Sequence, residues 1–189
     1  VVEAMGITKR FGATVALREA RISVAPGESH ALVGRNGAGK STLVSVLTGI
    51  QQPDSGSLRF SGEPAPAVGD TDAWRSKVAC VCQRSTVIPE LTVAETLFLD
   101  RQSAGALRPI RWKELRGRAE ALLAEYGVEV SASARIRDLS VEQRQFVEIA
   151  RALSFGARFI ILDEPTAQLD GDEIKRLFRR MRELQAEGV

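Results

Sequence analysis

Aromatic and sulfur-containing residues are scarce in this chain of 189 residues. Phenylalanine, tyrosine and tryptophan together make up 5% of it, and there are two cysteines and one histidine. Cys80 and Cys82 alternate along an expected strand, so both side chains point to the same face and are poorly placed for a disulfide. We expect both thiols to pack as small apolar groups rather than to bind a metal.

Long hydrophobic runs and an excess of one charge are also missing. No apolar run approaches the length of a membrane span, and the start lacks the charged-then-apolar layout of a signal peptide. Twenty-six basic and 24 acidic residues give a formal net charge of +2, with both signs interspersed. Neither nucleic acid nor anionic lipid is therefore strongly attracted. We expect a cytosolic protein that reaches a membrane only through partners, with one α/β domain and a substantial core.

The most informative motif follows the apolar run 31–33, which we expect to be a strand. Its residues fit the phosphate-binding pattern G-x-x-x-x-G-K-[ST] and are Gly34-Arg35-Asn36-Gly37-Ala38-Gly39-Lys40-Ser41. Glycines permit positive φ and bring backbone N–H groups close to a triphosphate. Lys40 would then reach the β- and γ-phosphates, and the Ser41 hydroxyl would ligate Mg²⁺. The motif predicts that residues 34–41 and the following Thr42 contact the nucleotide. A glycine-rich turn without a ligand is the weaker alternative.

A second candidate element lies at the far end of the chain. The apolar run 159–162 predicts a parallel strand buried on both faces, and Asp163 and Glu164 follow at its carboxyl end, where open α/β sheets bind ligands. We predict that Asp163 holds Mg²⁺, directly or through water, and that Glu164 orients and polarises the attacking water. An acid pair at a helix N-terminus is the alternative, because Pro165 permits a helix to start nearby.

Capping boxes mark two further helix starts. Ser140-x-x-Gln143 precedes a helical pattern in which Glu142, in the first turn, is favoured by the helix dipole, and Thr92-x-x-Glu95 is a second such box. Other patterns predict an opening β region (3–24), a helix whose apolar face (43–47) ends near Gly49, and a turn followed by a strand (53–60). Further along they predict a proline- and glycine-rich loop (62–71), a helix (112–126) stopped by Gly127, and a last amphipathic helix (174–184).

In this order, the motifs resemble those of the ABC-type ATPase family over essentially the whole chain. That family carries an aromatic residue before the phosphate loop, a glutamine loop, an L-S-G-G-Q signature, a strand ending in Asp-Glu and a short S-x-L-D loop. Beside the phosphate loop, the matching positions are Phe11, Gln83, Leu139-Ser140-Val141-Glu142-Gln143, Asp163-Glu164 and Leu169-Asp170. Residues 82–99 and the helix containing 147–153 look most like the ATP-binding subunits of bacterial importers of ribose, galactose and xylose.

The resemblance implies roles for residues that no spacing would assign. Phe11 would stack on adenine, although an isolated phenylalanine is equally an ordinary core residue. Gln83 would contact Mg²⁺ or the attacking water. Ser140 and Gln143 would face the γ-phosphate of ATP held by a second subunit. Two departures stand out. The signature glycines are replaced by Val141 and Glu142, and a carboxylate there would repel the phosphate, so we expect Glu142 to be splayed outward. Ala167 stands where the short loop often has serine.

The family also places a switch histidine on a later loop, and the chain stops at Val189 before reaching it. We therefore expect a piece of a longer protein, cut by design or by interruption of the gene, with weak turnover of its own. The single histidine, His30, lies on the expected strand before the phosphate loop, where we interpret it as a structural residue rather than a catalytic one.

Together these features predict one α/β domain over residues 1–189: a P-loop NTPase core with a mostly parallel sheet, an N-terminal antiparallel β region and a helical subdomain inserted at about 86–155. The expected function is to bind and hydrolyse ATP with Mg²⁺, paired with a second ABC ATPase domain, and to drive transmembrane permease subunits served by a solute-binding protein. The expected location is the inner face of the cell membrane, with no nucleic-acid partner.

Two other functions stay open. One is a soluble ABC ATPase of DNA repair or translation, against which the balanced charge argues. The other is a nucleotide-binding regulatory half with little turnover, which Glu142 and the missing histidine favour.

Overall fold

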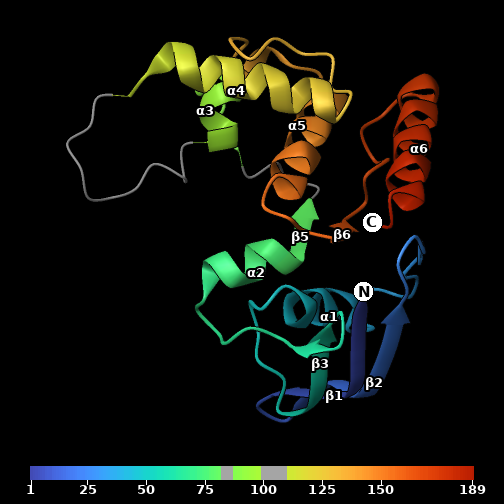
Figure 1. The fold of residues 1–189 in the computed structure, drawn as a ribbon. Helices are drawn as coiled ribbons and strands as arrows, with labels where there is room; N and C mark the ends of the chain where they lie inside the picture. Colours follow the sequence, from blue (N-terminus) through green and yellow to red (C-terminus); the bar gives the residue numbers. More distant parts are fainter. Residues whose placement is uncertain (82–86, 99–109) are drawn as a thin grey trace. The chain divides into compact units, whose positions relative to one another are not determined.

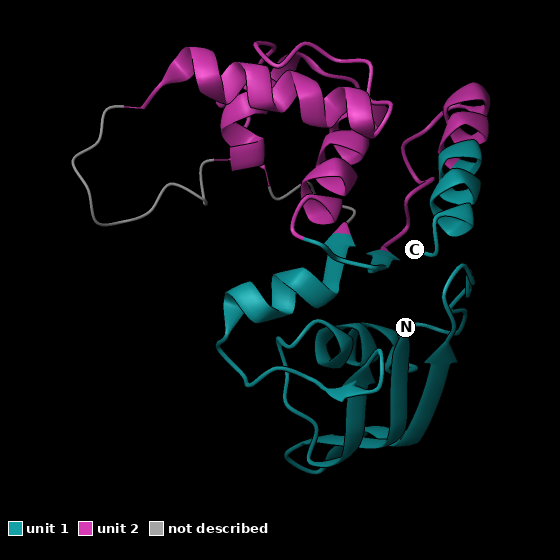
Figure 2. Cartoon of the chain, in the orientation of Figure 1, with its two compact units in different colours: residues 1–80, 156–161, 178–189 teal, residues 81–155, 162–177 magenta. Residues whose placement is uncertain are grey.

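The structure is a computed structural model that describes residues 1–81, 87–98 and 110–189 (Figure 1). The chain forms two compact units (Figure 2). The first unit comprises Val1–Cys80, Gly156–Ile161 and Phe178–Val189, and the second comprises Val81–Phe155 and Leu162–Leu177.

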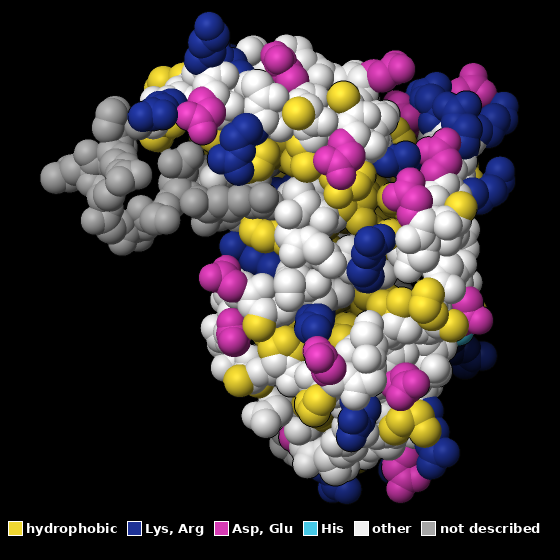
Figure 3. Space-filling model, in the orientation of Figure 1, with side chains coloured by type: hydrophobic (Ala, Val, Ile, Leu, Met, Phe, Trp, Pro, Cys, Tyr) yellow, Lys and Arg dark blue, Asp and Glu magenta, His cyan; other side chains and the backbone are white. Residues whose placement is uncertain are grey.

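Helices and strands are mixed along the chain, as expected for an α/β fold. In order they are β1 (Val2–Phe11), β2 (Thr14–Val24), α1 (Lys40–Leu47), β3 (Ser55–Phe60), β4 (Glu63–Pro64), α2 (Thr71–Lys77), β5 (Val78–Val81), α3 (Val93–Phe98), α4 (Trp112–Glu125), a 3₁₀ turn (Ile136–Asp138), α5 (Val141–Leu153), β6 (Phe159–Leu162) and α6 (Gly171–Ala186). Across the described residues, no helix has both the length and the apolar character needed to cross a membrane. Figure 3 shows acidic and basic side chains interspersed over the face in view.

A four-stranded sheet in the order β2-β1-β3-β4 begins the first unit, and both neighbours of β1 run antiparallel to it. The predicted N-terminal antiparallel region is thus confirmed. Its register shifts between Ala4 and Ile7 where β1 meets β2 and between Met5 and Thr8 where β1 meets β3, and Gly6 has φ 66° in both intervals. A positive φ of this kind is typical of a bulge, which adds local twist to the strand.

Helix α1 packs its apolar side into the core of the first unit. Leu43, Val46 and Leu47 are buried there, as the sequence predicts, while Val44 is half-buried. The core also contains Phe60 and Trp74, whose rings meet edge to face with centroids 5.8 Å apart. Edge-to-face contact is a favoured arrangement of two aromatic quadrupoles.

Helix α2 was not predicted from the sequence, which indicated only a loop over 62–71. Its start is capped by Asp70, whose Oδ1 accepts a hydrogen bond from the backbone N–H of Ala73 at 3.1 Å. An aspartate at this position is a recognised helix-start signal. The signal was available in the sequence, but a helix of seven residues offers too few positions for a clear periodicity.

Three helices, α3, α4 and α5, build the core of the second unit. Helix α4 ends at Glu125 and Gly127 follows with φ 61°, so the predicted helix over 112–126 is confirmed to within one residue. At the start of α3, Thr92 N–H donates to Glu95 Oε2 at 2.7 Å and Glu95 N–H donates to Thr92 Oγ1 at 3.3 Å, which confirms that capping box. The boundaries 86–155 of the helical subdomain stay a prediction.

Strands β5 and β6 form a separate two-stranded sheet. The predicted strand at 159–162 is confirmed as β6, but its four residues are half-buried rather than buried on both faces. Within the described part of the chain, β6 pairs with β5 alone, so its other edge lacks the neighbour that would cover it. Cys80 lies on β5, and Cys82 lies outside the described residues.

The contact between Gly49 and Trp74 yields a stability prediction. Gly49 has φ 75°, and a Cβ added to it would lie 2.3 Å from Cε2 of Trp74. Alanine in this conformation costs about 1–2 kcal/mol, and overpacking adds about 1–3 kcal/mol. We therefore expect Gly49→Ala to lower the free energy of unfolding by about 2–5 kcal/mol in denaturant titrations.

Gly62→Ala is the matched control for this experiment. Gly62 has φ 83°, but an added Cβ meets nothing within 4 Å. Its expected cost is therefore the backbone penalty alone, about 1–2 kcal/mol. Equal losses for the two variants would show that the tryptophan contact contributes nothing.

Candidate functional site

The glycine-rich loop ends directly at the N-terminus of α1. Gly37 has φ 80° and Gly39, the residue before the helix, has φ 88°, so the predicted left-handed turns are confirmed. A Cβ at Gly39 would lie 2.5 Å from the carbonyl oxygen of Ala16 on β2, whereas one at Gly37 would meet nothing within 4 Å. The loop is thus packed tightly against β2 at Gly39 and open at Gly37.

Lys40 folds its side chain back over this loop. Its Nζ donates to the carbonyl oxygens of Gly34 at 2.6 Å and Arg35 at 3.0 Å, and Ala38 N–H donates to Arg35 O at 3.1 Å. An ammonium group has three donors and only donates. Two of the three Lys40 donors bind carbonyls, so the positive charge lies at the phosphate loop, as the motif predicts. Residues 34–38 and Ser41 are exposed, and Thr42 is half-buried.

The strand predicted before the loop is not present. Residues 28–35 lie outside all strands; Leu32 is 46% and Val33 is 85% exposed. None of the described strands pairs with this segment, and an apolar run without a ladder partner has no reason to stay extended. The interpretation of His30 as a strand residue is therefore wrong. The ring is exposed, with Nε2 3.1 Å from Oε2 of Glu28.

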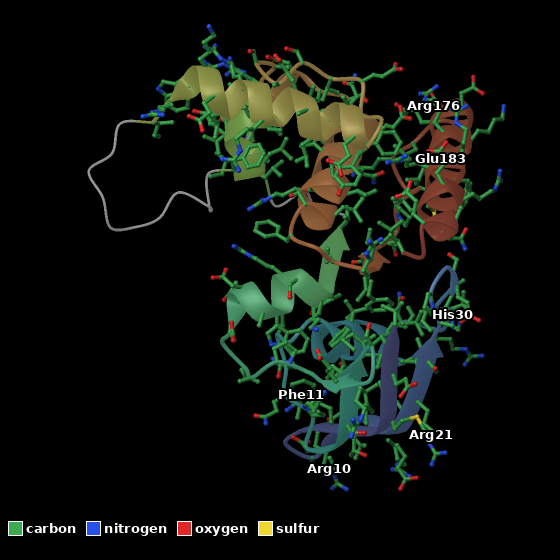
Figure 4. All side chains as sticks on the ribbon, in the orientation of Figure 1. Arg10, Phe11, Arg21, His30, Arg176 and Glu183 are labelled. Atoms are coloured by element: carbon green, nitrogen blue, oxygen red, sulfur yellow. The ribbon has the colours of Figure 1, made fainter. Side chains whose placement is uncertain are left out.

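Phe11 ends β1 and is 49% exposed (Figure 4). Nζ of Lys9 lies 5.7 Å from the ring centroid and 3.1 Å from Oδ1 of Asp54. The hydrogen bond from the backbone N–H of Arg10, followed by the one from Lys9, lowers the pKa of Asp54. An exposed ring is free to stack on a flat ligand, but adenine stacking by Phe11 stays a prediction.

Asp163 and Glu164 follow β6, and both are exposed. Asp163 N–H donates to the Val81 carbonyl at 3.0 Å, and the Glu164 carbonyl accepts from Ala167 N–H at 3.1 Å. Glu164 has φ 48°, which is uncommon for a residue with a Cβ. Such backbone strain costs about 1–3 kcal/mol and is concentrated at functional sites. The two exposed residues therefore lie at a tight turn at the end of the strand.

Ser140 and Gln143 form the predicted capping box at the start of α5. Gln143 N–H donates to Ser140 Oγ at 3.1 Å, and Ser140 N–H donates to Gln143 Oε1 at 3.0 Å. Both side chains therefore satisfy N–H groups of their own helix. The Ser140 hydroxyl keeps its proton free to donate to a further group.

The expectation that Glu142 is splayed outward is wrong. This residue is buried, with an exposed fraction of 6%. Both of its carboxylate oxygens are paired with Arg176 on α6, at 2.7 Å from Nε to Oε1 and 2.8 Å from Nη2 to Oε2. The two parallel bonds of a guanidinium compensate a buried carboxylate far better than a single contact. This hydrogen bonding raises the pKa of Arg176.

A second contact joins α5 to the segment that follows Glu164. Gln145 Nε2 donates to the carbonyl oxygen of Pro165 at 3.1 Å. Gln145 Oε1 is buried, and the described residues provide it with no hydrogen-bond partner. Neither Gln145 nor Arg176 was identified from the sequence. Gln145 lies two positions beyond the signature, whereas Arg176 is 34 positions from Glu142 and no local pattern links them.

Asp170, which the resemblance places in the S-x-L-D loop, caps α6. Its Oδ1 accepts hydrogen bonds from Asp172 N–H at 2.9 Å and Glu173 N–H at 2.8 Å, and its own N–H donates to Glu173 Oε2 at 3.0 Å. These bonds, the one from Glu173 first, lower the pKa of Asp170. The loop between the acid pair and α6 is therefore fixed at its far end by a third capping box.

Gln83, the remaining predicted site residue, lies outside the described residues. Among residues 1–81, 87–98 and 110–189, no three His, Cys, Asp or Glu groups gather as a metal site. The assignment of Ser41 and Asp163 as Mg²⁺ ligands stays a prediction. The structure brings the phosphate loop and Phe11 into the first unit, and the signature, the acid pair and Asp170 into the second.

The strained backbone of Glu164 yields a prediction that separates its conformation from its chemistry. Glycine occupies positive φ without a steric penalty, although it loses more chain entropy on folding. We expect Glu164→Gly to be more stable than Glu164→Gln by up to about 1 kcal/mol in thermal and denaturant melts. A glycine variant less stable than the glutamine variant would mean that the turn is not strained.

Comparison with known proteins agrees with these features. The family described as "ABC transporter" matches residues 17–167. Ribose import ATP-binding protein RbsA 1 of Burkholderia thailandensis is 48% identical over 184 residues, and its namesake in Streptomyces coelicolor is 44% identical over 183 residues. Each alignment covers 97% of this chain and 36% of the relative. The chain thus spans about a third of the length of these relatives.

Solved structures are similar over the whole chain. A nucleotide-free ATP-binding cassette from an ABC transporter superposes with a TM-score of 0.84 at 26% identity, covering 100% of this chain and 78% of the other. A dimeric post-hydrolysis state of the cassette MJ0796, bound to ADP and Pi, gives 0.77 at 28% identity, covering 100% and 84%. Since the family match extends over most of the chain and contains the phosphate loop, the signature and the acid pair, the chain belongs to the ABC transporter family.

Proposed function

We propose that this chain is the nucleotide-binding part of an ABC importer, which binds Mg·ATP and hydrolyses it to drive a permease. The observation that carries the proposal is the phosphate loop. Gly37 and Gly39 turn through positive φ into the N-terminus of α1, and Lys40 places its ammonium over the loop. Backbone N–H groups and the helix dipole favour an anion at this point. The open space beside Gly37 leaves room for a phosphate.

The predicted residues then divide the chemistry among them. Lys40 exchanges its two carbonyl partners for phosphate oxygens, and Ser41 and Asp163 supply the oxygen ligands that Mg²⁺ prefers. A bound Mg²⁺ neutralises charge on the phosphates. Glu164, exposed at the end of β6, accepts a proton from the attacking water and orients it. Gln83 contacts the metal ion or that water, and Phe11 stacks on the adenine.

The partners follow from the relatives and from the signature. Relatives named as ribose import ATP-binding proteins support a sugar as cargo, with transmembrane permease subunits, a solute-binding protein and a place at the inner membrane face. The dimeric MJ0796 cassette supports a second ATPase domain as the partner in closure. Ser140, exposed at the start of α5, and the half-buried Gln143 meet the γ-phosphate held by that domain. We further propose that the P-loop core contains the mostly parallel sheet of this family.

Two alternatives are less well supported. The regulatory-half hypothesis rested on Glu142 and on the missing histidine, and the Glu142 carboxylate is paired with Arg176. A role in DNA repair or translation would favour a basic face, whereas acidic and basic side chains are interspersed on the face that Figure 3 shows. The rate of ATP turnover by this chain alone stays a prediction.

Removal of the loop ammonium tests nucleotide binding. A charge-assisted contact contributes about 1.5–3 kcal/mol, so we expect Lys40→Ala to weaken Mg·ATP binding roughly ten- to a hundredfold in titration calorimetry, with the fold intact. Lys77→Ala is the control, because Lys77 forms a surface ion pair with Glu63 at 2.9 Å. Unchanged affinity in the Lys40 variant would remove this residue from the site.

Glu164→Gln tests hydrolysis separately from binding. The amide keeps the shape of the side chain but cannot accept a proton from water as a carboxylate does. In the full-length protein we expect Mg·ATP affinity to stay unchanged and steady-state ATPase activity to be lost, measured by phosphate release. Turnover at the parent rate would assign the role to another group.

A further inference from the structure

The signature contains a carboxylate, Glu142, that would repel a nucleotide phosphate, and no neighbouring residue in the signature carries a compensating positive charge. Glu142 is the second residue of α5, next to Val141 and two positions after the capping serine. A helix N-terminus attracts anions, and a phosphate that approaches Ser140 would meet this carboxylate in the same turn. Unless the charge is compensated, two anions compete for one helix end.

The structure compensates this charge through a single side chain from another helix. Arg176 extends from α6 (Figure 4) and binds both carboxylate oxygens of Glu142, at 2.7 and 2.8 Å. Ser140, in contrast, remains exposed at the helix start. The fixed fork of the guanidinium determines the direction of the carboxylate as well as its charge.

The charged residues next to Arg176 are paired with each other rather than with Glu142. Lys175 is 79% exposed and pairs within the helix with Asp172 at 2.8 Å. Asp170 and Glu173 satisfy each other in the capping box. Lys175 and Arg180 thus pair within α6, with Asp172 and Glu183, whereas Arg176 pairs with Glu142 on the signature helix.

We propose that Arg176 is a positioning residue that holds the Glu142 carboxylate against α6, so that the signature presents Ser140 without a competing negative charge to a nucleotide phosphate. The inference rests on the proposed function, because it needs a nucleotide held by a second ATPase domain. In this chain, the pair Glu142 and Arg176 replaces what the family obtains from a glycine. The carboxylate is retained but turned away and neutralised.

Removal of Arg176 should release the carboxylate toward the phosphate. The probe is Mg·ATP-dependent association of the chain in a Glu164→Gln background, measured by sedimentation at low and high salt. We expect Arg176→Ala to weaken association at least about tenfold at low salt. High salt should restore most of this loss, because exposed charges are screened. A purely structural role of Arg176 would not give this salt dependence.

Second-site variants separate charge from folding. Glu142→Gln combined with Arg176→Ala removes both charges, and we expect association to return to the parent level. Arg176→Lys keeps the charge but loses the fork, and an intermediate value is expected. Lys175→Ala is the matched control; it removes one positive charge at the adjacent position and should leave association unchanged. Thermal melts and Mg·ATP titration accompany every variant.

Several results would overturn the inference. These are parent-like association of Arg176→Ala, a double variant as weak as the single one, a loss that salt does not relieve, and a parent that binds Mg·ATP without associating. If the Arg176→Ala protein does not fold, the double variant decides, since it buries no unpaired charge. A parent that fails to bind Mg·ATP would instead overturn the proposed function.

Discussion

The close approach of Gly39 to the Ala16 carbonyl is the constraint on which the phosphate loop depends. Gly39 has to take a left-handed conformation to lead the loop into α1, and it has to do so where a Cβ would lie 2.5 Å from the backbone of β2. Only glycine meets both requirements. The loop therefore packs against β2 of the antiparallel β1–β2 pair. Because α1 buries Leu43, Val46 and Leu47 in the same core, the direction of its N-terminus is fixed by packing as well as by the turn.

The second unit is organised around α5 in a comparable way. Two side chains of this helix hold the segment that carries the acid pair: Gln145 binds Pro165, next to Glu164, and Glu142 binds Arg176, beyond Asp170. The strained residue Glu164 directly precedes the first contact, and the capping box of α6 lies between the two. The signature helix and the acid-pair segment are thus fixed to each other at two points within one unit. Both contacts are partly buried.

The replacement of the signature glycines shows how a departure from a family pattern can be absorbed. A carboxylate within a motif that meets phosphate is unfavourable by Coulomb's law alone. In the structure this carboxylate is paired with Arg176, in a geometry that only a guanidinium can provide at both oxygens. Membership of the ABC transporter family, with Lys40, Ser140 and Asp163-Glu164 at their expected places along the chain, is consistent with a signature that stays compatible with a nucleotide.

Local patterns in the sequence determined the phosphate loop, the capping boxes at Thr92 and Ser140, the helix ending at Gly127 and the strand before Asp163. The capping boxes and the helix end are governed by hydrogen bonds and steric preferences that reach no more than four residues along the chain. The phosphate loop and the strand before Asp163 were predicted from a motif and an apolar run, but their placement also depends on β2 and β5. Only the tertiary structure decided the partners of Glu142 and Gln145, the partial exposure of β6 and the absence of a strand at residues 31–33. Each of these depends on which distant segment lies alongside. A carboxylate cannot indicate from its own position that an arginine 34 residues away will bind it, and an apolar run cannot indicate whether a neighbouring strand will cover it.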